Sequence, residues 1–360
     1  MAASPRPLRV LSVGPERYGH GGISSVVQLQ AAEAARRADV QFEHLATFRD
    51  GTRAVKVRAA VRGSAGVLLR LARRRTDVLH LHVSFRGSAV RKGVLIALAK
   101  AFRVPTVLHA HGSEFVSWFD GLPAAAQWMF RRGLRASAVV VLAENLRPEY
   151  ASRLRIPLDR ITAVENPVEL PVVAAPHAGV DPVTMVFLGR FGSRKGIFDL
   201  ISAIGTLPEK VRNRLRVVAA GDGQVAEVRQ AVSLLRLDSV VTVSDWLAPE
   251  EKSALLARSQ ILALPSYHEG LPMAVLEGMA TGLAPLVTPV GGLSELIEDG
   301  RNGVLVQPGD VAGIAAAITL LVTDEDRRAA LGAAARGTAR AHSVPPWFDQ
   351  LETIWRRVSR

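Results

Sequence analysis

The sequence predicts an α/β protein of two domains, each built on a parallel sheet that is covered by helices. Short apolar segments typical of buried strands alternate with helical segments along most of the chain. A segment rich in Pro and Ala, near 167–182, interrupts this alternation and has the composition of a semi-rigid linker. A length of 360 residues is enough for two such domains, each with its own core.

The first strand, Leu8–Val13, leads through a glycine-rich turn into a helix, as a doubly wound α/β domain begins. The turn lacks the G-x-G-x-x-G spacing of dinucleotide sites, and no acidic residue ends a second strand about 20 positions later. These differences disfavour a nicotinamide cofactor. Gly21 and Gly22 either let the backbone approach a ligand closely or form a structural tight turn.

His111 follows directly after the predicted strand Thr106–His109. Open α/β sheets bind ligands beyond the carboxyl ends of their strands, so this position favours a functional role, although a lone histidine is more often structural. The next residues include Glu114 and Trp118 in a segment with three aromatic side chains. We predict that this aromatic loop closes over a ligand or contacts a partner.

Three further histidines lie close to His111 in this pattern. His80 and His82 end the strand Val78–His82, and His109 ends the strand before His111. We predict that they occupy strand ends or line a cleft. A zinc site is the alternative, but the two H-x-H pairs lie on separate strands, which disfavours a metal.

The second half begins with the predicted strand Val183–Leu188, which leads to Arg190 and Lys195 on a turn that contains three glycines. Two cations beside helix-terminal amides could neutralise a diphosphate without a metal. The alternative is a pair of solvated surface cations. Further turns at Gly221 and at Ser244–Trp246 follow later strands, so the sequence predicts one rim that receives a ligand.

The segment Leu264–Gly292 carries two carboxylates, Glu269 and Glu277. Pro272 between them is predicted to be the first helical residue. The amides of Gly270, Leu271 and Met273 would then offer an anion site at a helix N-terminus. A phosphate flanked by carboxylates, which accept hydrogen bonds from hydroxyl groups, indicates a pocket for a nucleotide sugar.

The chain ends with a largely helical region, Ile314–Ala341, and a helix after Pro345-Pro346 whose apolar stripe includes Trp347 and Trp355. We expect this last helix to dock on the first domain. The expected division is 1–170 for the first domain, 171–182 for the linker, 183–344 for the second domain and 345–360 for the C-terminal helix.

Composition narrows the possible functions. The chain has no Cys, which excludes disulfides and thiol nucleophiles, and neither a secretory segment nor an apolar stretch of membrane-spanning length is evident. Residues 1–172 carry a net formal charge of +13, whereas the whole chain carries +12. The segment Arg49–Arg75 is basic and amphipathic, so it either contacts an anionic bilayer or forms a solvated helix face. Few aromatic residues and no binding motif argue against nucleic acid.

Together these residues resemble the retaining glycosyltransferases of the GT-B fold, in glycosyltransferase family four, also called glycosyl transferases group 1. The ordered set covers nearly the whole chain, although the family often has an aromatic residue and a glycine where this chain has Leu271-Pro272, which leaves the donor sugar open. The matched positions are Gly21-Gly22, His111-Gly112, Gly189-Arg190, Lys195-Gly196, Gly221-Asp222-Gly223, Glu269-x7-Glu277, Gly291-Gly292 and Glu295.

The resemblance implies two Rossmann-like domains that face each other across a cleft, and it implies residue roles. Arg190 and Lys195 would hold a donor diphosphate, Glu269 would orient sugar hydroxyls, and Glu277 would bind the ribose. His111 would contact the sugar from the opposite domain. The resulting assignment is catalytic for His111 and Glu269, donor-binding for Gly22, Arg190, Lys195, Gly221, Gly270, Leu271 and Glu277, and acceptor-binding for Gly21, Glu114 and Trp118.

The implied activity is transfer of a hexosyl-type sugar, with retention, from a UDP- or GDP-linked donor to a glycan or lipid-linked acceptor in cell-surface polysaccharide or glycolipid synthesis. Neither a cofactor nor a metal would be required, because Arg, Lys and helix ends offset the phosphate charge. The expected location is the cytoplasm, and peripheral association with the inner face of the plasma membrane stays open. A sugar-nucleotide epimerase of the same fold and a non-catalytic relative that binds nucleotide sugars are the alternatives.

Overall fold

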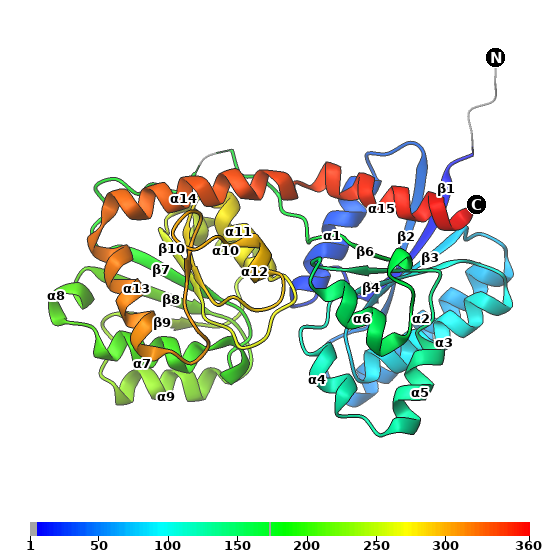
Figure 1. Cartoon of the computed structure of the whole chain (residues 1–360), viewed down its shortest axis with the longest axis horizontal. Helices are drawn as coiled ribbons and strands as arrows, with labels where there is room; N and C mark the ends of the chain where they lie inside the picture. Colours follow the sequence, from blue (N-terminus) through cyan, green and yellow to red (C-terminus); the bar gives the residue numbers. More distant parts are fainter. Residues whose placement is uncertain (1–5, 173) are drawn as a thin grey trace, which may run out of the picture. The chain divides into compact units, whose positions relative to one another are not determined.

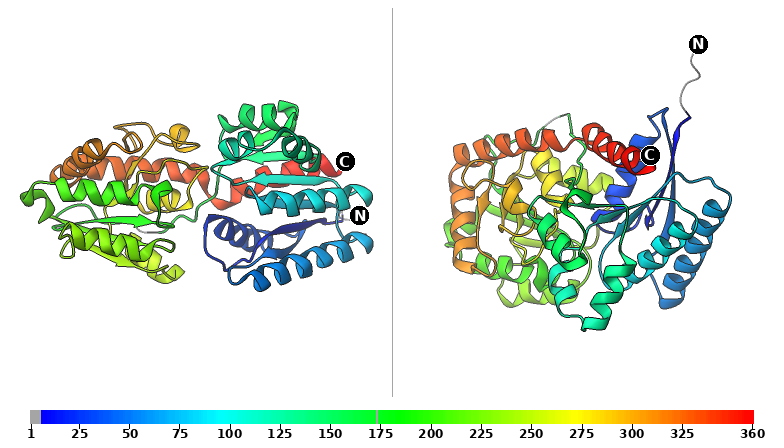
Figure 2. Two further views of the ribbon diagram at one scale, coloured as in Figure 1. Left: turned by 90° about the horizontal axis from the view of Figure 1, so that it is seen from below. Right: turned by 45° about the vertical axis from the view of Figure 1, so that its right-hand side comes forward.

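The computed structural model describes residues 6–172 and 174–360 and divides into two compact units. Unit 1 contains the chain up to Pro167 and the C-terminal segment Val344–Arg360, and unit 2 contains Val168–Ser343 (Figure 1). Each unit is a parallel sheet between two layers of helices (Figure 2). The predicted α/β architecture with two domains is therefore confirmed.

Unit 1 has a six-stranded parallel sheet in the order β2-β1-β3-β4-β5-β6. The inner strands β3 and β4 are buried along their whole length, as expected for a sheet covered on both faces. The strands are β1 (Leu8–Pro15), β2 (Val40–Phe48), β3 (Val78–Val83), β4 (Thr106–Ala110), β5 (Ala138–Val141) and β6 (Ile161–Ala163). The helices are α1 (Gly22–Ala34), α2 (Arg53–Ala72), α3 (Gly87–Ala101), α4 (Phe115–Asp120), α5 (Ala124–Gly133), α6 (Leu146–Leu154), the 3-10 turn η1 (Leu158–Arg160) and α15 (Val344–Ser359).

The C-terminal helix α15 returns to unit 1, as expected, and packs against α1 and β3. Trp347, Phe348, Leu351 and Trp355 are all buried along it. The helix begins at Val344, before the position expected from the sequence, because Pro345 and Pro346 fit its first turn, where no intrahelical N–H bond is lost.

Unit 2 has a six-stranded parallel sheet in the order β12-β11-β10-β7-β8-β9. The strands are β7 (Val183–Leu188), β8 (Leu215–Ala220), β9 (Val241–Ser244), β10 (Ile261–Leu264), β11 (Ala284–Val287) and β12 (Val304–Leu305). The helices are α7 (Ile197–Thr206), α8 (Glu209–Arg212), α9 (Val225–Leu234), α10 (Pro249–Ala257), α11 (Met273–Thr281), α12 (Leu293–Leu296), α13 (Val311–Thr323) and α14 (Glu325–Ala339), with 3-10 turns η2 (Ser193–Lys195) and η3 (Arg340–His342).

The region predicted as largely helical, Ile314–Ala341, contains two helices, because Asp324 ends α13 and its side chain caps α14 by accepting from the amide of Arg327. One expectation about unit 2, that of a separate linker near 167–182, differs from the structure. The Pro- and Ala-rich segment packs on unit 2: Ala175 donates to the carbonyl of Thr281, and His177 Nε2 lies 2.7 Å from the carbonyl of Gly282. Among the described residues, no helix combines the length and apolarity needed to cross a membrane.

Candidate functional site

The strand order of unit 2 reverses between β7 and β10, which pair with each other while their following helices lead in opposite directions along the sheet. In open α/β sheets, ligands bind beyond the carboxyl ends of the strands at such a reversal. Lys195 follows β7 and Glu269 follows β10, and their charged atoms Nζ and Oε1 lie 2.5 Å apart. The structure thus brings together two of the residues singled out in the sequence.

The loop that carries Glu269 is held by neighbouring loops. Ser266 Oγ donates to Glu269 Oε1 at 2.7 Å, and Thr288 Oγ1 donates to the carbonyl of Ser266 at 2.5 Å. Gly291 has a φ of 56°, and a Cβ atom there would lie 2.0 Å from the carbonyl oxygen of Glu269. Only glycine fits this contact, so the backbone at Glu269 has a fixed position.

The second carboxylate, Glu277, lies on α11 and pairs with Lys252 on α10, whose Nζ is 2.7 Å from Glu277 Oε1. The expected start of α11 was wrong by one residue. Pro272 is the N-cap, in an extended conformation, and the first helical residue is Met273. The side chain of Leu271 is buried, so this departure from the family pattern packs into unit 2.

Arg190 follows β7 and forms a two-pronged ion pair with Asp222, with distances of 3.0 and 2.8 Å. Its side chain is nevertheless 63% exposed, so it can reach an incoming ligand by a rotamer change. Gly221 has a structural reason to be glycine, because a Cβ atom there would lie 1.8 Å from the carbonyl oxygen of Gly189. The adjacent loops after β7 and β8 therefore touch backbone to backbone.

In unit 1, His111 directly follows β4 and its ring stacks on His109, with centroids 4.2 Å apart. Its Nε2 lies 3.0 Å from Nδ1 of His82. Burial lowers the pKa of His111 to about 3, so its ring is neutral at pH 7. A neutral imidazole can bind a polar ligand but does not carry positive charge to a phosphate.

The other predicted residues of unit 1 occupy the starts of helices. Gly21 is the N-cap of α1 with a φ of 108°, open space surrounds the position of a Cβ atom there, and Gly22 is the first helical residue. The glycine pair is therefore a strand-to-helix turn with an open face. Glu114 is the N-cap of α4, but its side chain makes no capping bond to the helix.

The segment predicted as an aromatic loop forms a short helix instead. Phe115 and Phe119 lie on α4 and are buried in the core of unit 1, where Phe115 stacks on Tyr150. Trp118 is half-buried and packs edge-on against Phe130. The aromatic side chains lie in this segment because they anchor a short helix, and Trp118 is the one of the three that is only partly buried.

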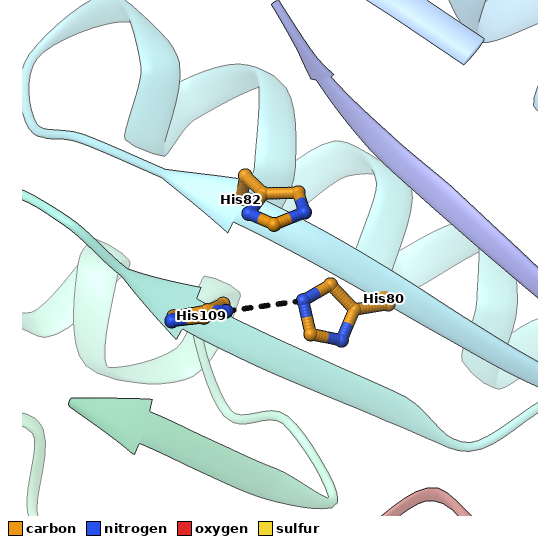
Figure 3. Close-up of side chains that lie close together, drawn as sticks. All are labelled: His80, His82 and His109. Atoms are coloured by element: carbon orange, nitrogen blue, oxygen red, sulfur yellow. Dashed lines mark hydrogen bonds between the residues drawn. The ribbon is translucent and has the colours of Figure 1, made fainter. Parts of the chain in front are cut away.

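The three other histidines are fully buried within the strands rather than at a cleft wall. Ligand nitrogens of His80, His82 and His109 all lie within 4.8 Å of one another, a spacing that a metal ion could use (Figure 3). Each ring also has protein partners: Trp355 Nε1 donates to His80 Nδ1 at 2.9 Å, and His80 Nε2 lies 3.3 Å from His109 Nδ1. The contribution of Trp355, 275 positions away from His80, left no local signal in the sequence.

Gln30 was also missed. It lies fully buried on α1, with its amide 3.1 Å from His82 Nε2. A polar residue on the apolar side of a helix was the available signal, because a buried amide needs polar partners.

Comparison with known proteins agrees with this architecture. Two family models match, "Glycosyl transferases group 1" over residues 174–338 and "Glycosyltransferase Family 4" over residues 21–171. The alpha-maltose-1-phosphate synthase of Mycolicibacterium smegmatis is 28% identical, over 96% of this chain and 97% of that protein. The alpha-D-kanosaminyltransferase of Streptomyces kanamyceticus is 26% identical, over 78% of this chain and 77% of that protein.

Solved structures show the same fold. HepE of Anabaena, in complex with UDP and glucose, superposes with a TM-score of 0.75 at 17% identity, covering 96% of this chain and 98% of HepE. The sucrose-phosphate synthase of Thermosynechococcus elongatus superposes with a TM-score of 0.77 at 17% identity, covering 97% and 98% of the two chains. With both units matched by family models and by the fold, the chain belongs to the group 1, family 4 glycosyltransferases of the GT-B fold.

Proposed function

We propose that unit 2 binds a nucleotide-sugar donor, linked to UDP or GDP, at the loops that follow β7 and β10. The observation that carries this proposal is the Lys195–Glu269 pair at the reversal of strand order. A cation and a carboxylate held side by side match the two parts of such a donor, since a diphosphate needs positive charge and sugar hydroxyls need acceptors. HepE, with the same fold, was crystallised with UDP-glucose.

The same pair explains how the site remains stable without a ligand. Glu269 and Lys195 have side-chain exposures of only 6% and 13%, and an unpaired charge at such a depth would be costly. On donor binding, phosphate oxygens would share the ammonium group of Lys195, and sugar hydroxyls would donate to Glu269. Arg190 would leave Asp222 for the second phosphate, and Glu277 would accept from the ribose hydroxyls.

The backbone amides of Gly270 and Leu271 would add donors to the diphosphate, because they precede the N-terminus of α11. Gly221 would act indirectly, since its contact with Gly189 shapes the loop that bears Arg190. Gly22, at the start of α1, would face the donor phosphates with its amide.

Unit 1 would supply His111 and the acceptor site. We assign to His111 a hydrogen bond with a sugar hydroxyl, because its ring is neutral and held by His82. Gly21, Glu114 and Trp118 would bind the acceptor, through the open face of the turn, a carboxylate and the exposed edge of an indole. The acceptor class is a glycan or a lipid-linked saccharide.

The proposed reaction retains the anomeric configuration. The acceptor would attack on the same face of the sugar that the phosphate leaves, and the leaving phosphate would take the acceptor proton. Glu269 would be a hydroxyl anchor and not a nucleophile, because Lys195 and Ser266 already occupy its Oε1 and hold it in place. Rate enhancement would come from cations placed at the departing phosphate.

We further propose that the reaction needs no metal and that the histidines His80, His82 and His109 form a hydrogen-bonded core. The indole of Trp355 can only donate, so His80 Nδ1 accepts and His80 Nε2 carries the proton that is donated to His109. Neither nitrogen of His80 then has a lone pair for a metal ion. A metal would have to break the bond from Trp355 in a dry interior.

Association with an anionic membrane surface is proposed for unit 1. Helices α2, α3 and α5 cover one face of the sheet, and α3 contacts both of the others. Apolar side chains that face outward on these helices are Val57, Val61, Val90, Val94, Trp128 and Met129, each at least half exposed.

Arg53, Arg58 and Arg62 on α2 form no ion pair within the part of the chain that the structure describes. Exposed apolar groups among unpaired cations fit an anionic bilayer. Such a surface is where cell-surface glycans and glycolipids are assembled.

A panel of UDP- and GDP-sugars, tested by thermal shift and by release of the nucleotide diphosphate with candidate acceptors, tests the function. Stabilisation by one class and acceptor-dependent release would support a transferase. Acceptor-independent turnover to a rearranged or free sugar would favour the epimerase alternative. Binding without turnover for every acceptor tested would favour the non-catalytic alternative, and binding of neither class would refute the donor assignment.

A further inference from the structure

A series of hydrogen-bonding groups in unit 1 leads from a backbone carbonyl to His111 through the buried interior. His44 Nε2 lies 2.8 Å from the carbonyl oxygen of Pro15, and His44 Nδ1 lies 3.1 Å from Ser12 Oγ. Ser12 Oγ lies 3.5 Å from the amide of Gln30, which lies 3.1 Å from His82 Nε2. His82 Nδ1 then meets His111 Nε2 at 3.0 Å. Ser12, Gln30 and His82 are almost completely excluded from solvent.

The carbonyl of Pro15 fixes the direction of the first two bonds. A carbonyl oxygen only accepts, so His44 Nε2 must carry a hydrogen. Burial lowers the pKa of His44 to about 4, so this ring is neutral at pH 7. Its Nδ1 therefore carries a lone pair and accepts a hydrogen bond. Ser12 must therefore donate its single hydroxyl hydrogen to His44.

That assignment determines what Gln30 must offer. Ser12 Oγ has no hydrogen left, so it faces Gln30 as an acceptor. The structure places the amide oxygen of Gln30 toward Ser12 and His82, and leaves Gln30 Nε2 buried without a partner among the described residues. The two ends of a side-chain amide are nearly isosteric, and their assignment follows from the surrounding hydrogen bonds. Turned by 180°, the amide nitrogen donates one hydrogen to Ser12 Oγ and the other to His82 Nε2.

We propose that Gln30 is a positioning residue which, with Ser12 and His82, fixes the tautomer of His111 so that its outer nitrogen Nδ1 is a hydrogen-bond donor. Because His82 Nε2 accepts from Gln30, the hydrogen of the neutral His82 ring lies on Nδ1 and is donated to His111 Nε2. The hydrogen of His111 is then on Nδ1, which makes no hydrogen bond within the chain as far as the structure describes it. His111 offers a donor, aimed at an oxygen acceptor of a ligand such as a sugar hydroxyl.

The opposite amide orientation would give the opposite chemistry. Gln30 would accept from His82 Nε2, His111 would donate from Nε2 to His82, and His111 Nδ1 would present a lone pair that can only bind a ligand's hydrogen. Two amide hydrogens of Gln30 would then be buried without partners, whereas the proposed orientation leaves only one oxygen unpaired. The buried relay thus selects between two binding properties of His111 Nδ1.

The test is the tautomer of His111 in the full chain labelled with ¹⁵N-histidine. Long-range ¹H–¹⁵N spectra at pH 7 distinguish a protonated Nδ1 from a protonated Nε2, and the His111 signals are identified by their loss in His111→Asn. We expect a protonated Nδ1 on both His82 and His111. A protonated Nε2 on His111 in the wild-type chain would overturn the proposal.

A variant then tests the role of Gln30. Gln30→Glu has the same shape but cannot donate from its carboxylate, so it should move the His111 hydrogen to Nε2, whereas Ser25→Ala on the same helix should leave it in place. An unchanged His111 tautomer in folded Gln30→Glu would refute the assignment to Gln30.

The use of this donor by a sugar rests on the proposed function. There, Gln30→Glu should lower kcat/KM about three- to tenfold, the effect of losing one neutral hydrogen bond, with nucleotide affinity unchanged. Since the spectra require no turnover, they support or refute the tautomer even if the chain proves not to use nucleotide sugars.

Discussion

Lys195 Nζ lies 2.5 Å from Glu269 Oε1, so the ion pair ties the loop after β7 to the loop after β10 at the reversal of strand order in unit 2. Neither charge is free in the absence of a ligand. In the proposed function, a diphosphate would compete with Glu269 for Lys195, and the hydroxyl groups of the attached sugar would replace the interaction that Glu269 loses. This relationship would make binding depend on both halves of a nucleotide sugar, because either half alone would leave one member of the pair without its partner.

Lys195→Met should weaken binding of the nucleotide-sugar donor by about tenfold to a hundredfold, the range for loss of a charge-assisted hydrogen bond. Isothermal titration calorimetry with the donor selected from the panel measures the effect. Lys210→Met on α8, an exposed lysine, is the matched control and should bind like the wild type.

Because Lys195→Met also leaves Glu269 buried without its cation, the double variant Lys195→Met/Glu269→Gln separates stability from binding. The double variant should recover the lost thermal stability but not the lost affinity. Recovery of both would mean that Lys195 only neutralises Glu269, and the phosphate role would have to be abandoned.

Glu277→Gln should reduce affinity for both the nucleotide sugar and the free nucleoside diphosphate about threefold to tenfold, because a neutral amide accepts ribose hydrogen bonds less strongly than a carboxylate. Lys252→Met removes the partner of Glu277 and is the comparison. If Glu277→Gln weakened only the nucleotide sugar and left the nucleoside diphosphate unaffected, Glu277 would contact the sugar and not the ribose.

The fold was predictable because its causes are local and repetitive. Apolar strands, glycine turns and helices recur along the chain. Each strand and the helix that follows it can be predicted from a short stretch of sequence, without knowledge of distant contacts. The return of α15 was predictable from one apolar stripe, since Trp347 and Trp355 need a surface to cover them. The division of Ile314–Ala341 into two helices was not recognised. Asp324 was the available signal, because aspartate is favoured at helix N-caps, and its side chain accepts from the amide of Arg327.

The sequence singled out the residues of the candidate site but did not predict the Lys195–Glu269 ion pair. The sequence placed Lys195 and Glu269 after two strands, yet only the sheet order brings those strands together. It also interpreted Phe115 and Phe119 as a binding surface, whereas tertiary packing buries them. Burial of an aromatic residue depends on partners such as Tyr150 that lie far away in the sequence, so local composition cannot decide it.

Treatment with EDTA should leave donor turnover unchanged, because Lys195, Arg190 and helix-end amides supply the positive charge in the proposed mechanism. Release of the nucleotide diphosphate is measured before and after chelation, together with the metal content of the purified protein. Loss of turnover that Mn²⁺ restores would contradict the metal-free mechanism, and stoichiometric zinc would contradict a purely hydrogen-bonded role for His80, His82 and His109.

Vesicles that contain anionic lipid should bind the protein, and added salt should weaken this binding, since charges at a bilayer surface are screened. The triple variant Arg53→Gln/Arg58→Gln/Arg62→Gln should bind at least several-fold less in co-sedimentation. The control Lys210→Gln/Arg216→Gln/Arg258→Gln removes the same charge from exposed positions of unit 2. Equal losses in both variants would show that net charge, and not the face formed by α2, α3 and α5, is responsible.

Lys92→Met should stabilise unit 1 at pH 7. The Lys92 side chain is buried on α3, and its Nζ donates to Thr47 Oγ1 at 2.7 Å. Burial, together with the nearby Arg91, lowers the pKa of Lys92 from 10.5 to about 7. Between these two values the unfolded chain binds more protons than the folded chain, so the Lys92 contribution to stability rises with pH.

The slope of this contribution reaches about 1.4 kcal/mol per pH unit, so the advantage of Lys92→Met should shrink by on the order of 3–4 kcal/mol between pH 7 and pH 10. Urea unfolding followed by tryptophan fluorescence reports mainly on unit 1, which contains Trp118, Trp128, Trp347 and Trp355, whereas unit 2 contains Trp246. Lys210→Met, with an exposed lysine, should show no such pH-dependent difference. A stability gap between Lys92→Met and wild type that stayed constant over this pH range would show that Lys92 remains protonated in the folded chain.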